Sequence, residues 1–368
     1  MILPLRPDLI GIEPYGAPQL NVPVALNTNE NPYPPPAEVI AEMAESVSRA
    51  AATGNRYPDR DFTELRTHLA AYLARESGAK ELTADNIWAA NGSNEVMMHI
   101  LQAYGGPGRR ALSFAPTYAM YAEYARDTFT DYVAGVRGQD FRLDADDALD
   151  QIAQVRPAVV FLASPNNPTG TAMDLETIER IAAGTADTGP DRAATVVVID
   201  EAYAEFRRQG TQSALSIRPG YPHVAVTRTM SKAFAFAGAR VGYLAAAPEM
   251  VDALRVVRLP YHLSAITQAV ARTALDHAAV LQASVAALRT ARDECVDWLR
   301  SEGFTVADSD ANFVLFGAFH DRHAIWQGLL DRGVLIRETG PEGYLRVSIG
   351  TEEEMAAFRG ALKEVTSR

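Results

Sequence analysis

Five short apolar runs, each ending in polar residues or glycine, constrain the fold of this chain more than any other feature. They are NIWAANGSN, RALSFAPTY, AVVFLASPNNPTG, TVVVIDEAY and HVAVTRTMSK. Such runs, rich in Val, Ile and Phe and separated by helical stretches, are typical of strands in a mostly parallel sheet that is buried on both faces. The pattern predicts an α/β fold with helices on both sides of a central sheet.

The segments on either side of these runs differ from them. The first 36 residues are rich in proline and predict an extended arm that lies across another surface. AEVIAEMAESVSRAA and FTELRTHLAAYLARES follow with helical periodicity. A long helical stretch from about Ser264 to Glu302 precedes short strands (GFTVADSD, NFVLFG, GVLIRE, YLRVSIG) and two helices, at about 321–331 and 351–366. We therefore expect an arm (1–36), a large domain (37–262) and a small α+β domain (263–368).

Composition excludes several classes of function. The chain has 368 residues, of which 48% are hydrophobic and 22% charged, as in ordinary soluble globular proteins. Its net charge of -12 argues against nucleic-acid binding, because no basic stripe is available to neutralise phosphates. The N-terminus MILPLRPDLIG lacks the pattern of a signal peptide, and no stretch approaches ~18 apolar residues. We expect a cytoplasmic protein with no membrane partner.

No metal site is predicted. The single cysteine, Cys295, lies in the helical pattern ALRTARDECVDWLR and is interpreted as a core thiol. It excludes a disulfide framework and any multi-cysteine zinc site. His320 and His323 lack a third ligand nearby and are interpreted as a solvated surface pair.

Polar groups that follow the apolar runs are expected to meet at one edge of the sheet, where open parallel sheets bind ligands. The turn after NIWAA opens a helix and could bind a phosphate. SPNNPTG would present Asn167 from a fixed bend, and Asp200 at the end of TVVVID is costly to bury unless it meets a cation. Each of these features alone is also compatible with an ordinary turn or a capping side chain.

Lysine is rare in this chain. Of 34 basic residues only three are lysines, and Lys80 and Lys363 lie in polar surroundings that predict surface positions. Lys232 stands among small and apolar residues, where a lysine can lose its charge and form an imine. The alternative is a surface lysine with a buried stem. Lys232, Asp200 and Asn167 form one set with the candidate phosphate-binding residues Gly92, Ser93, Asn94, Ser231 and Arg240. These groups together fit pyridoxal phosphate, which needs an amine, a carboxylate and phosphate donors.

These motifs together carry a family resemblance. SPNNPTG, VVVIDEAYAEF and TRTMSKAFAFAGARVGY resemble the fold-type I pyridoxal-phosphate aminotransferases. NTNENPYPPP, NRYPD, NGSNE, SFAPTYAMY, LPYHLS and SDANFVLF resemble, more narrowly, the histidinol-phosphate aminotransferases. The resemblance covers nearly the whole chain. It implies a large domain with a mostly parallel central sheet, a small α+β C-terminal domain and pyridoxal 5'-phosphate as cofactor.

The resemblance also implies roles for single residues. Lys232 would form the imine and then move a proton between the substrate Cα and C4' of the cofactor. Asp200 would pair with the ring nitrogen, Tyr203 and Asn167 would bond the 3'-oxygen, and Tyr118 would stack on the ring. The cofactor phosphate would be held by Ser93, Asn94, Thr229, Ser231 and Arg240.

Two further roles concern the substrate and the partner subunit. Tyr57 in NRYPD would reach the phosphate site of a neighbouring subunit, which implies a homodimer with shared active sites. Arg346 would hold the anionic end of the substrate, with Arg337, Tyr15 and Asn167 also at this site. A planar guanidinium suits both a carboxylate and a phosphate.

The leading hypothesis is transamination between L-histidinol phosphate and 2-oxoglutarate in histidine biosynthesis. The first alternative is an aromatic amino acid aminotransferase acting on phenylalanine or tyrosine, and another is a pyridoxal-phosphate lyase or decarboxylase. A ligand-sensing domain of a transcription regulator is disfavoured, because the aminotransferase pattern starts within the first 30 residues and the charge is -12.

Overall fold

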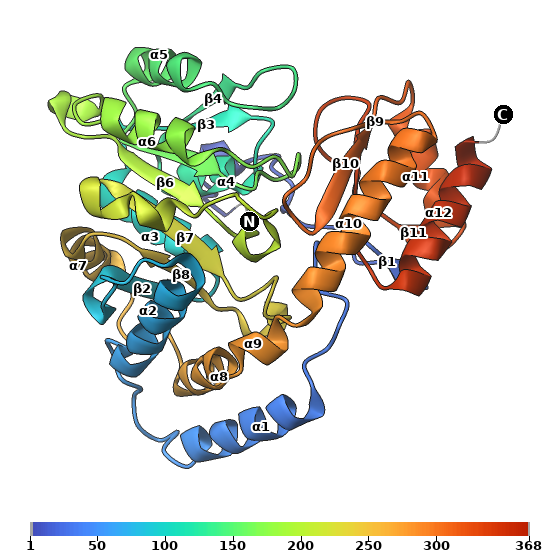
Figure 1. The fold of residues 1–368 in the computed structure, drawn as a ribbon. Coiled ribbons are helices and arrows are strands. Elements are labelled where there is room, and N and C mark those ends of the chain that lie inside the picture. The colour runs from blue at the N-terminus through green and yellow to red at the C-terminus, as the bar shows by residue number, and fades with distance from the viewer. Residues whose placement is uncertain (1–2, 367–368) are drawn as a thin grey trace.

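A seven-stranded sheet forms the centre of the larger part of the molecule in the computed structural model, which describes residues 3–366 (Figure 1). Its order is β2 (Ile87–Ala90), β8 (Gly242–Ala245), β7 (Val224–Thr229), β6 (Val196–Asp200), β5 (Val159–Ala163), β3 (Arg110–Ala115) and β4 (Asp131–Val136). Neighbouring strands from β7 to β4 are parallel, whereas β8 runs antiparallel to both β2 and β7. The predicted α/β fold with a mostly parallel sheet is confirmed.

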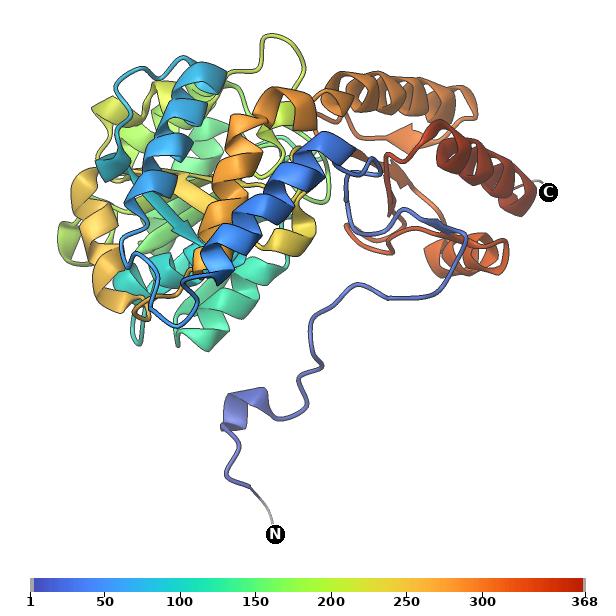
Figure 2. The same cartoon turned by 90° about the horizontal axis from the view of Figure 1, so that it is seen from below.

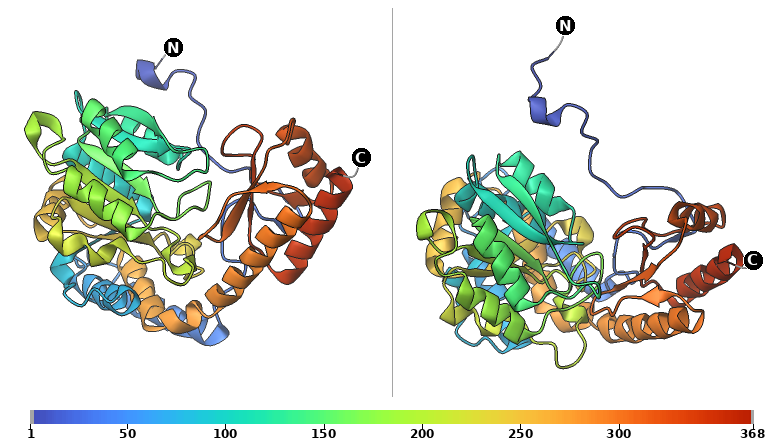
Figure 3. Two further views of the ribbon diagram at one scale, coloured as in Figure 1. Left: turned by 45° about the horizontal axis from the view of Figure 1, so that its top comes forward. Right: turned by 90° about the horizontal axis from the view of Figure 1, so that it is seen from above.

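Helices cover both faces of this sheet (Figure 3). They are α2 (Thr63–Ser77), α3 (Ser93–Tyr104), α4 (Met120–Asp127), α5 (Ala145–Val155), α6 (Leu175–Gly184), α7 (Pro248–Val257) and α8 (Ala265–Asp276), with α1 (Ala37–Ala51) packed on α8. Every residue of β5 and β6 is buried. This explains why these strands are continuous apolar runs rather than alternating patterns.

The smaller part is built from the C-terminal third and a short piece of the N-terminal arm. Its three-stranded antiparallel sheet has the order β12 (Leu345–Ser348), β10 (Phe313–Gly317) and β9 (Thr305–Val306). Beside it, β1 (Val24–Ala25) pairs in parallel with β11 (Val334–Leu335). The helices are α10 (Ser284–Ser301), α11 (Arg322–Asp331) and α12 (Glu352–Thr366).

The predicted long helical stretch is interrupted twice. It consists of α8, the one-turn α9 (Ala278–Leu281) and α10, which extends into the smaller part (Figure 1). Leu281 belongs to the core of the larger part, whereas Val285 belongs to that of the smaller one. No proline or glycine marks these breaks. They arise because the chain changes direction to pack on two separate cores. The predicted domain boundary between residues 262 and 263 stays a prediction.

The N-terminal segment projects away from the main body before it joins the smaller part (Figure 2). It contains the 3-10 turn η1 (Pro7–Leu9), and the Arg6 guanidinium lies 4.0 Å from the centre of the Phe129 ring. Residues 1 and 2 of the predicted arm and residues 367 and 368 of the predicted small domain lie outside the described residues. Within residues 3–366, none of the helices is long and apolar enough to span a membrane.

Candidate active site

A cavity of about 460 Å³ lies at the carboxyl ends of the central strands, where they face the smaller part. Of the residues expected at the site, every one except Tyr57 and Gly92 lines it. They are Tyr15, Ser93, Asn94, Tyr118, Asn167, Asp200, Tyr203, Thr229, Ser231, Lys232, Arg240, Arg337 and Arg346. The fold therefore brings together side chains that lie up to 331 positions apart in the sequence, from Tyr15 to Arg346.

Lys232 follows β7 and extends into this cavity. Its Nζ donates a hydrogen bond to the carbonyl oxygen of Thr28 at 3.1 Å. The pKa of Lys232 is lowered to about 8, mainly by burial and also by the nearby Arg346 guanidinium, while the Glu30 carboxylate opposes this shift. A large fraction of this amine is therefore neutral near pH 8, and a neutral amine is the form that acts as a nucleophile or base.

Asp200 is the last residue of β6 and is buried. Its Oδ2 accepts a hydrogen bond from Tyr121 at 2.7 Å, and its Oδ1 accepts from the Ala202 amide at 3.2 Å and the Thr227 hydroxyl at 3.3 Å. Burial raises the pKa of Asp200 despite these bonds. Among the described residues, no Lys, Arg or His side chain forms an ion pair with it, so the carboxylate is oriented but its charge is not neutralised.

The opposite end of the cavity is suited to an anion. Gly92 precedes α3 with φ +90°, and a Cβ there would lie 2.5 Å from Nη2 of Arg240. No side chain caps the first turn of α3, so its backbone N–H groups remain free to bind a ligand. Ser231 completes this end, with its Oγ 3.4 Å from Nη1 of Arg240 and 3.0 Å from Oγ1 of Thr229.

Tyr203 and Asn167 lie on the side wall. The Tyr203 hydroxyl accepts hydrogen bonds from Nδ2 of Asn29 at 3.0 Å and from Nδ2 of Asn167 at 3.4 Å. Its own proton is therefore free to donate to a ligand oxygen. Tyr118 lies on another wall, with its ring perpendicular to that of Tyr121 at 5.5 Å.

Arg346, in β12, is buried at 6% exposure and has no carboxylate partner among the described residues. Its Nη1 donates to Oδ1 of Asn167 at 2.5 Å, its Nη2 donates to the carbonyl oxygen of Asn27 at 3.0 Å, and its Nε has no partner. Burial lowers the pKa of Arg346. Arg337, half-buried nearby, donates from Nη2 to the carbonyl oxygen of Gly16 at 3.2 Å. A buried guanidinium with an unsatisfied N–H is suited to binding an anionic ligand.

Tyr57 lies outside the cavity. Its side chain is 80% exposed, and its ring stacks on Tyr261 with the centroids 4.4 Å apart.

Sequence reasoning missed three residues that shape the site. Tyr121 orients Asp200, Asn29 bonds Tyr203, and the carbonyl of Thr28 holds the amine of Lys232. Tyr121 lies three residues after Tyr118 in APTYAMY, and NTNEN was noted only as part of the resemblance. Tyr121 could have been found from its position about one helical turn after Tyr118, within a motif that was already identified.

The residues present fit pyridoxal 5'-phosphate. Asp200 is a buried carboxylate that pairs with no cationic side chain of residues 3–366, and a protonated ring nitrogen would supply a cation. Gly92 leaves space beside Arg240 at the start of α3, where no side chain caps the helix, and this space suits a phosphate. Lys232 supplies an amine with a lowered pKa. These groups fit the ring nitrogen, the phosphate and the aldehyde of one molecule.

Comparison with known proteins agrees with this geometry. The sequence model of the family "Aminotransferase class I and II" matches residues 22–362. The chain therefore belongs to the class I and II aminotransferases.

The relatives that show the narrower family are similar to this chain over almost their whole length. Histidinol-phosphate aminotransferase 3 of Burkholderia lata is 59% identical over 363 residues, which are 99% of this chain and 96% of that protein. Histidinol-phosphate aminotransferase of Thermobifida fusca is 59% identical over 366 residues, with coverage of 100% and 96%. Within its class, the chain therefore belongs to the histidinol-phosphate aminotransferases. Among solved structures, histidinol-phosphate aminotransferase of Sinorhizobium meliloti in complex with pyridoxal-5'-phosphate has the same fold, with a TM-score of 0.83, 23% identity and coverage of 99% and 98%.

Proposed function

We propose that this protein catalyses reversible transamination between L-histidinol phosphate and 2-oxoglutarate, giving imidazole-acetol phosphate and glutamate, as a step of histidine biosynthesis. The observation that carries the substrate assignment is Arg346, a buried guanidinium that lacks an anionic partner among the described residues and lines the same cavity as Lys232. Similarity to histidinol-phosphate aminotransferases over nearly the full chain supports the same substrate.

Pyridoxal phosphate is the cofactor, and when bound it supplies the carbonyl that accepts the amino group and the ring that takes up the electron pair released at the substrate Cα. Asp200, fixed by Tyr121 and Thr227, holds a proton on the ring nitrogen. Tyr203 donates to the 3'-oxygen, and Asn167 holds the Tyr203 hydroxyl in place. Ser93, Asn94, Thr229, Ser231 and Arg240 bind the phosphate group.

Lys232 moves the proton. Its neutral amine would take the proton from the substrate Cα, and the resulting ammonium would return it at C4', the carbon of the cofactor carbonyl. The pKa of Lys232, lowered to about 8, makes the neutral form more accessible near physiological pH than in an ordinary lysine, as a general base requires. The carbonyl of Thr28 gives the Lys232 amine a hydrogen-bond acceptor close to the position from which it acts.

Arg346 binds the anionic end of both substrates in turn. In one half-reaction this group is a carboxylate of glutamate, and in the other it is the phosphate of histidinol phosphate. Both anions have the spacing of oxygens that a guanidinium binds with two parallel hydrogen bonds. Arg337 and Tyr15 line the same end of the cavity and add donors.

We also propose a cytoplasmic homodimer in which Tyr57 completes the phosphate site of the partner subunit. Tyr57 is exposed and lies outside its own cavity, and Val256 and Leu259 are large apolar side chains that are 83% and 75% exposed. Burial of such side chains against a second copy would stabilise a dimer.

Comparison of kcat/KM for histidinol phosphate and for phenylalanine, with 2-oxoglutarate as acceptor, tests the function. We expect a clear preference for histidinol phosphate, because a phosphate offers more charge and more acceptor oxygens to Arg346 and the neighbouring Arg337 than the carboxylate of phenylalanine does. A preference for phenylalanine would instead support an aromatic amino acid aminotransferase. Release of carbon dioxide without formation of glutamate would indicate a decarboxylase.

A further inference from the structure

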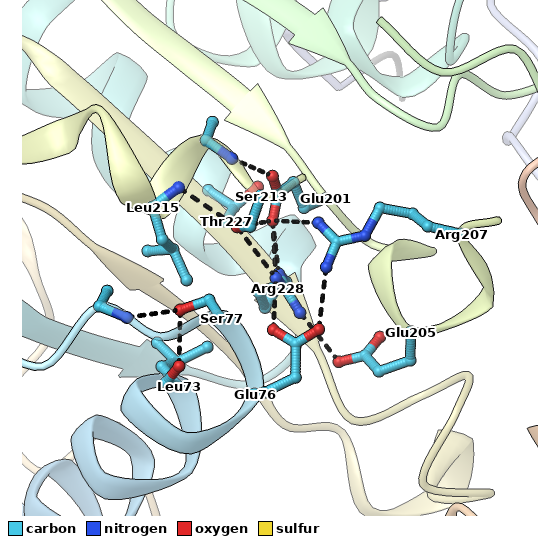
Figure 4. Close-up of polar contacts among 12 residues, drawn as sticks. Leu73, Glu76, Ser77, Glu201, Glu205, Arg207, Ser213, Leu215, Thr227 and Arg228 are labelled. Atoms are coloured by element: carbon cyan, nitrogen blue, oxygen red, sulfur yellow. Dashed lines mark hydrogen bonds and ion pairs between the residues drawn. The ribbon is translucent and has the colours of Figure 1, made fainter. Parts of the chain in front are cut away.

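A buried ionic network lies behind the active site, on the reverse side of the ends of β6 and β7 (Figure 4). At its centre is Arg228, whose side chain is 1% exposed. Successive residues of a strand point to opposite faces of the sheet. Thr227 and Thr229 therefore face the cavity, where Thr227 bonds Asp200 and Thr229 lines the wall, while Arg228 points away from it.

The Arg228 guanidinium binds three carboxylates from separate parts of the chain. Its Nη2 lies 2.7 Å from Oε2 of Glu201 and donates to Oε2 of Glu76 at 3.0 Å, and its Nη1 donates to Oε1 of Glu205 at 3.1 Å. Glu76 belongs to α2, whereas Glu201 and Glu205 follow β6. One side chain thus connects β7 to α2 and to the segment that carries Asp200 and Tyr203.

Each carboxylate is itself held in place. Glu201 accepts hydrogen bonds from the Ser213 hydroxyl and the Ala214 amide, both at 2.8 Å. Glu205 accepts from the Tyr72 hydroxyl at 2.9 Å, and Glu76 accepts from Nη2 of Arg207 at 2.9 Å. The network is therefore rigid, and Arg228 cannot move without breaking several charge-assisted bonds.

The same network also fixes the segment that meets the smaller part of the molecule. The carbonyl of Arg207 accepts from Nη1 of Arg289 in α10 at 2.9 Å, and the Tyr203 ring packs against Phe313 of β10 with centroids 5.0 Å apart. The position of residues 200–207 therefore depends on Arg228 from one side and on the smaller part from the other.

We propose that Arg228 is a positioning residue of the cofactor site. From the reverse face of the sheet, its bonds to Glu201, Glu205 and Glu76 hold the ends of β6 and β7 together. Asp200 and Thr229, on the opposite face, therefore stay in fixed positions relative to the cofactor. Strand pairing places Asp200 opposite Thr227, one residue before Arg228. Glu201, one residue after Asp200, is the partner that Arg228 binds at the shortest distance, so the clamp acts directly beside the ring-nitrogen carboxylate.

Loss of Arg228 would also change the charge behind Asp200. Burial raises the pKa of Asp200, and the Glu201 carboxylate adds to this effect. Without the guanidinium, Glu201 would keep only the longer ion pair with Arg207, at 3.7 Å, and its buried charge next to Asp200 would be less compensated. The inference rests on the proposed function, since it concerns how the chain holds the cofactor.

The test compares Arg228→Met with Arg66→Met, a matched control. Arg66 is also buried, and its Nε donates to the carbonyl of Ile87, the first residue of β2, which is the end of that strand away from the cavity. Both variants lose the hydrogen bonds of a buried guanidinium, so both are expected to unfold at lower temperature than the wild type. Only the Arg228 variant is expected to change the cofactor site.

Cofactor affinity and the pH dependence of the absorbance of the bound cofactor are the decisive measurements. For Arg228→Met we expect the dissociation constant of pyridoxal phosphate to rise by at least about tenfold and the pH midpoint to shift, because small displacements of positioned groups are costly. Arg66→Met should retain wild-type values of both. Wild-type cofactor affinity and pH midpoint in Arg228→Met, or equal changes in the two variants, would overturn the inference.

A milder variant keeps the test decisive if Arg228→Met does not fold. Arg228→Lys retains the charge but cannot bind three carboxylates at once, so weakened cofactor binding with a smaller loss of stability is expected. Wild-type cofactor affinity in a folded Arg228→Lys protein contradicts the inference. A wild-type protein that binds no pyridoxal phosphate would contradict the proposed function itself, and that result is distinguishable from failure of the Arg228 clamp.

Discussion

Arg228 and Arg346 are both buried arginines near the active site, but their surroundings are opposite. Arg228 is surrounded by carboxylates, and their charges raise its pKa against the effect of burial. Arg346 bonds only an amide oxygen and a carbonyl, keeps one N–H without a partner, and has a pKa lowered by burial. A guanidinium whose partners are all provided by the chain maintains the structure, whereas one that lacks an anion is available to a substrate.

The same contrast distinguishes the two faces of the strand ends. On the reverse face, Glu201 accepts bonds from Arg228, Ser213 and Ala214. On the cavity face, Asp200 accepts three hydrogen bonds but forms no ion pair with a described residue. Adjacent residues at the end of β6 thus serve chemistry (Asp200) and structure (Glu201), and substitutions on the two faces should have different effects.

The largest effect is expected on the cavity face, from Lys232→Ala. Turnover should fall by at least about 10⁴-fold, because both covalent attachment of the cofactor and proton transfer are lost. Steady-state assays with histidinol phosphate and the absorbance spectrum of the purified protein check this. Turnover near the wild-type level would refute the assignment of Lys232.

Substitution of Arg346 tests the comparison directly. For Arg346→Met we expect kcat/KM for histidinol phosphate to fall by about 100-fold or more, because the buried anion loses its partner. The melting temperature of the apoprotein should fall less than in Arg228→Met, since Arg346 pairs with no carboxylate among the described residues, whereas Arg228→Met leaves buried carboxylates without their main cation. Equal loss of stability in the two variants would show that the distinction between these arginines is wrong.

The pH dependence of cofactor attachment examines the cavity face further. Because Lys232 has a pKa lowered to about 8, its neutral fraction rises as pH increases through that value. The rate at which the apoprotein binds pyridoxal phosphate covalently should therefore rise with pH and level off above pH 8. Stopped-flow absorbance measures this rate, and a midpoint near the ordinary lysine value would mean that the amine is not desolvated.

The smallest effect is expected from Tyr57→Phe, which removes one hydroxyl from the surface of the subunit. If this group reaches the partner's cofactor phosphate, the dissociation constant of the cofactor should rise by roughly tenfold, the contribution of one hydrogen bond to a charged group. Equilibrium dialysis of the cofactor is a sufficient assay. An unchanged dissociation constant would count against the contact across the proposed dimer.

The parts of the molecule that sequence predicted best are those in which local pattern and burial agree. β5 and β6 are continuous apolar runs up to Asp200, β7 begins as one, and Asn167, Asp200, Ser231 and Lys232, at or after the ends of these strands, line the cavity. By contrast, β4 and β8 were not predicted. β4 is a short, partly exposed edge strand whose pattern is weakened by Gly135, and β8 lies in GARVGYLAAA, where glycine and alanine favour no strand pattern.

The ionic network could not be predicted for a different reason. Glu201, Glu205 and Arg228 lie within motifs that were identified, but Glu76 is 152 residues from Arg228 and belongs to another element. A charged residue in a sequence has no visible partner until the fold places one beside it. The breaks between α8, α9 and α10 likewise depend on packing against two cores rather than on any local signal.

The central claim is that Arg346, which pairs with no carboxylate of the described residues, binds the anionic group of the substrate. A crystal structure of the holoenzyme with histidinol phosphate tests this claim most directly. The account predicts that the substrate phosphate lies within hydrogen-bond distance of Arg346, including the Nε that has no partner in the free protein. Binding of the phosphate elsewhere, with Arg346 still bonded only to Asn167 and Asn27, would contradict it.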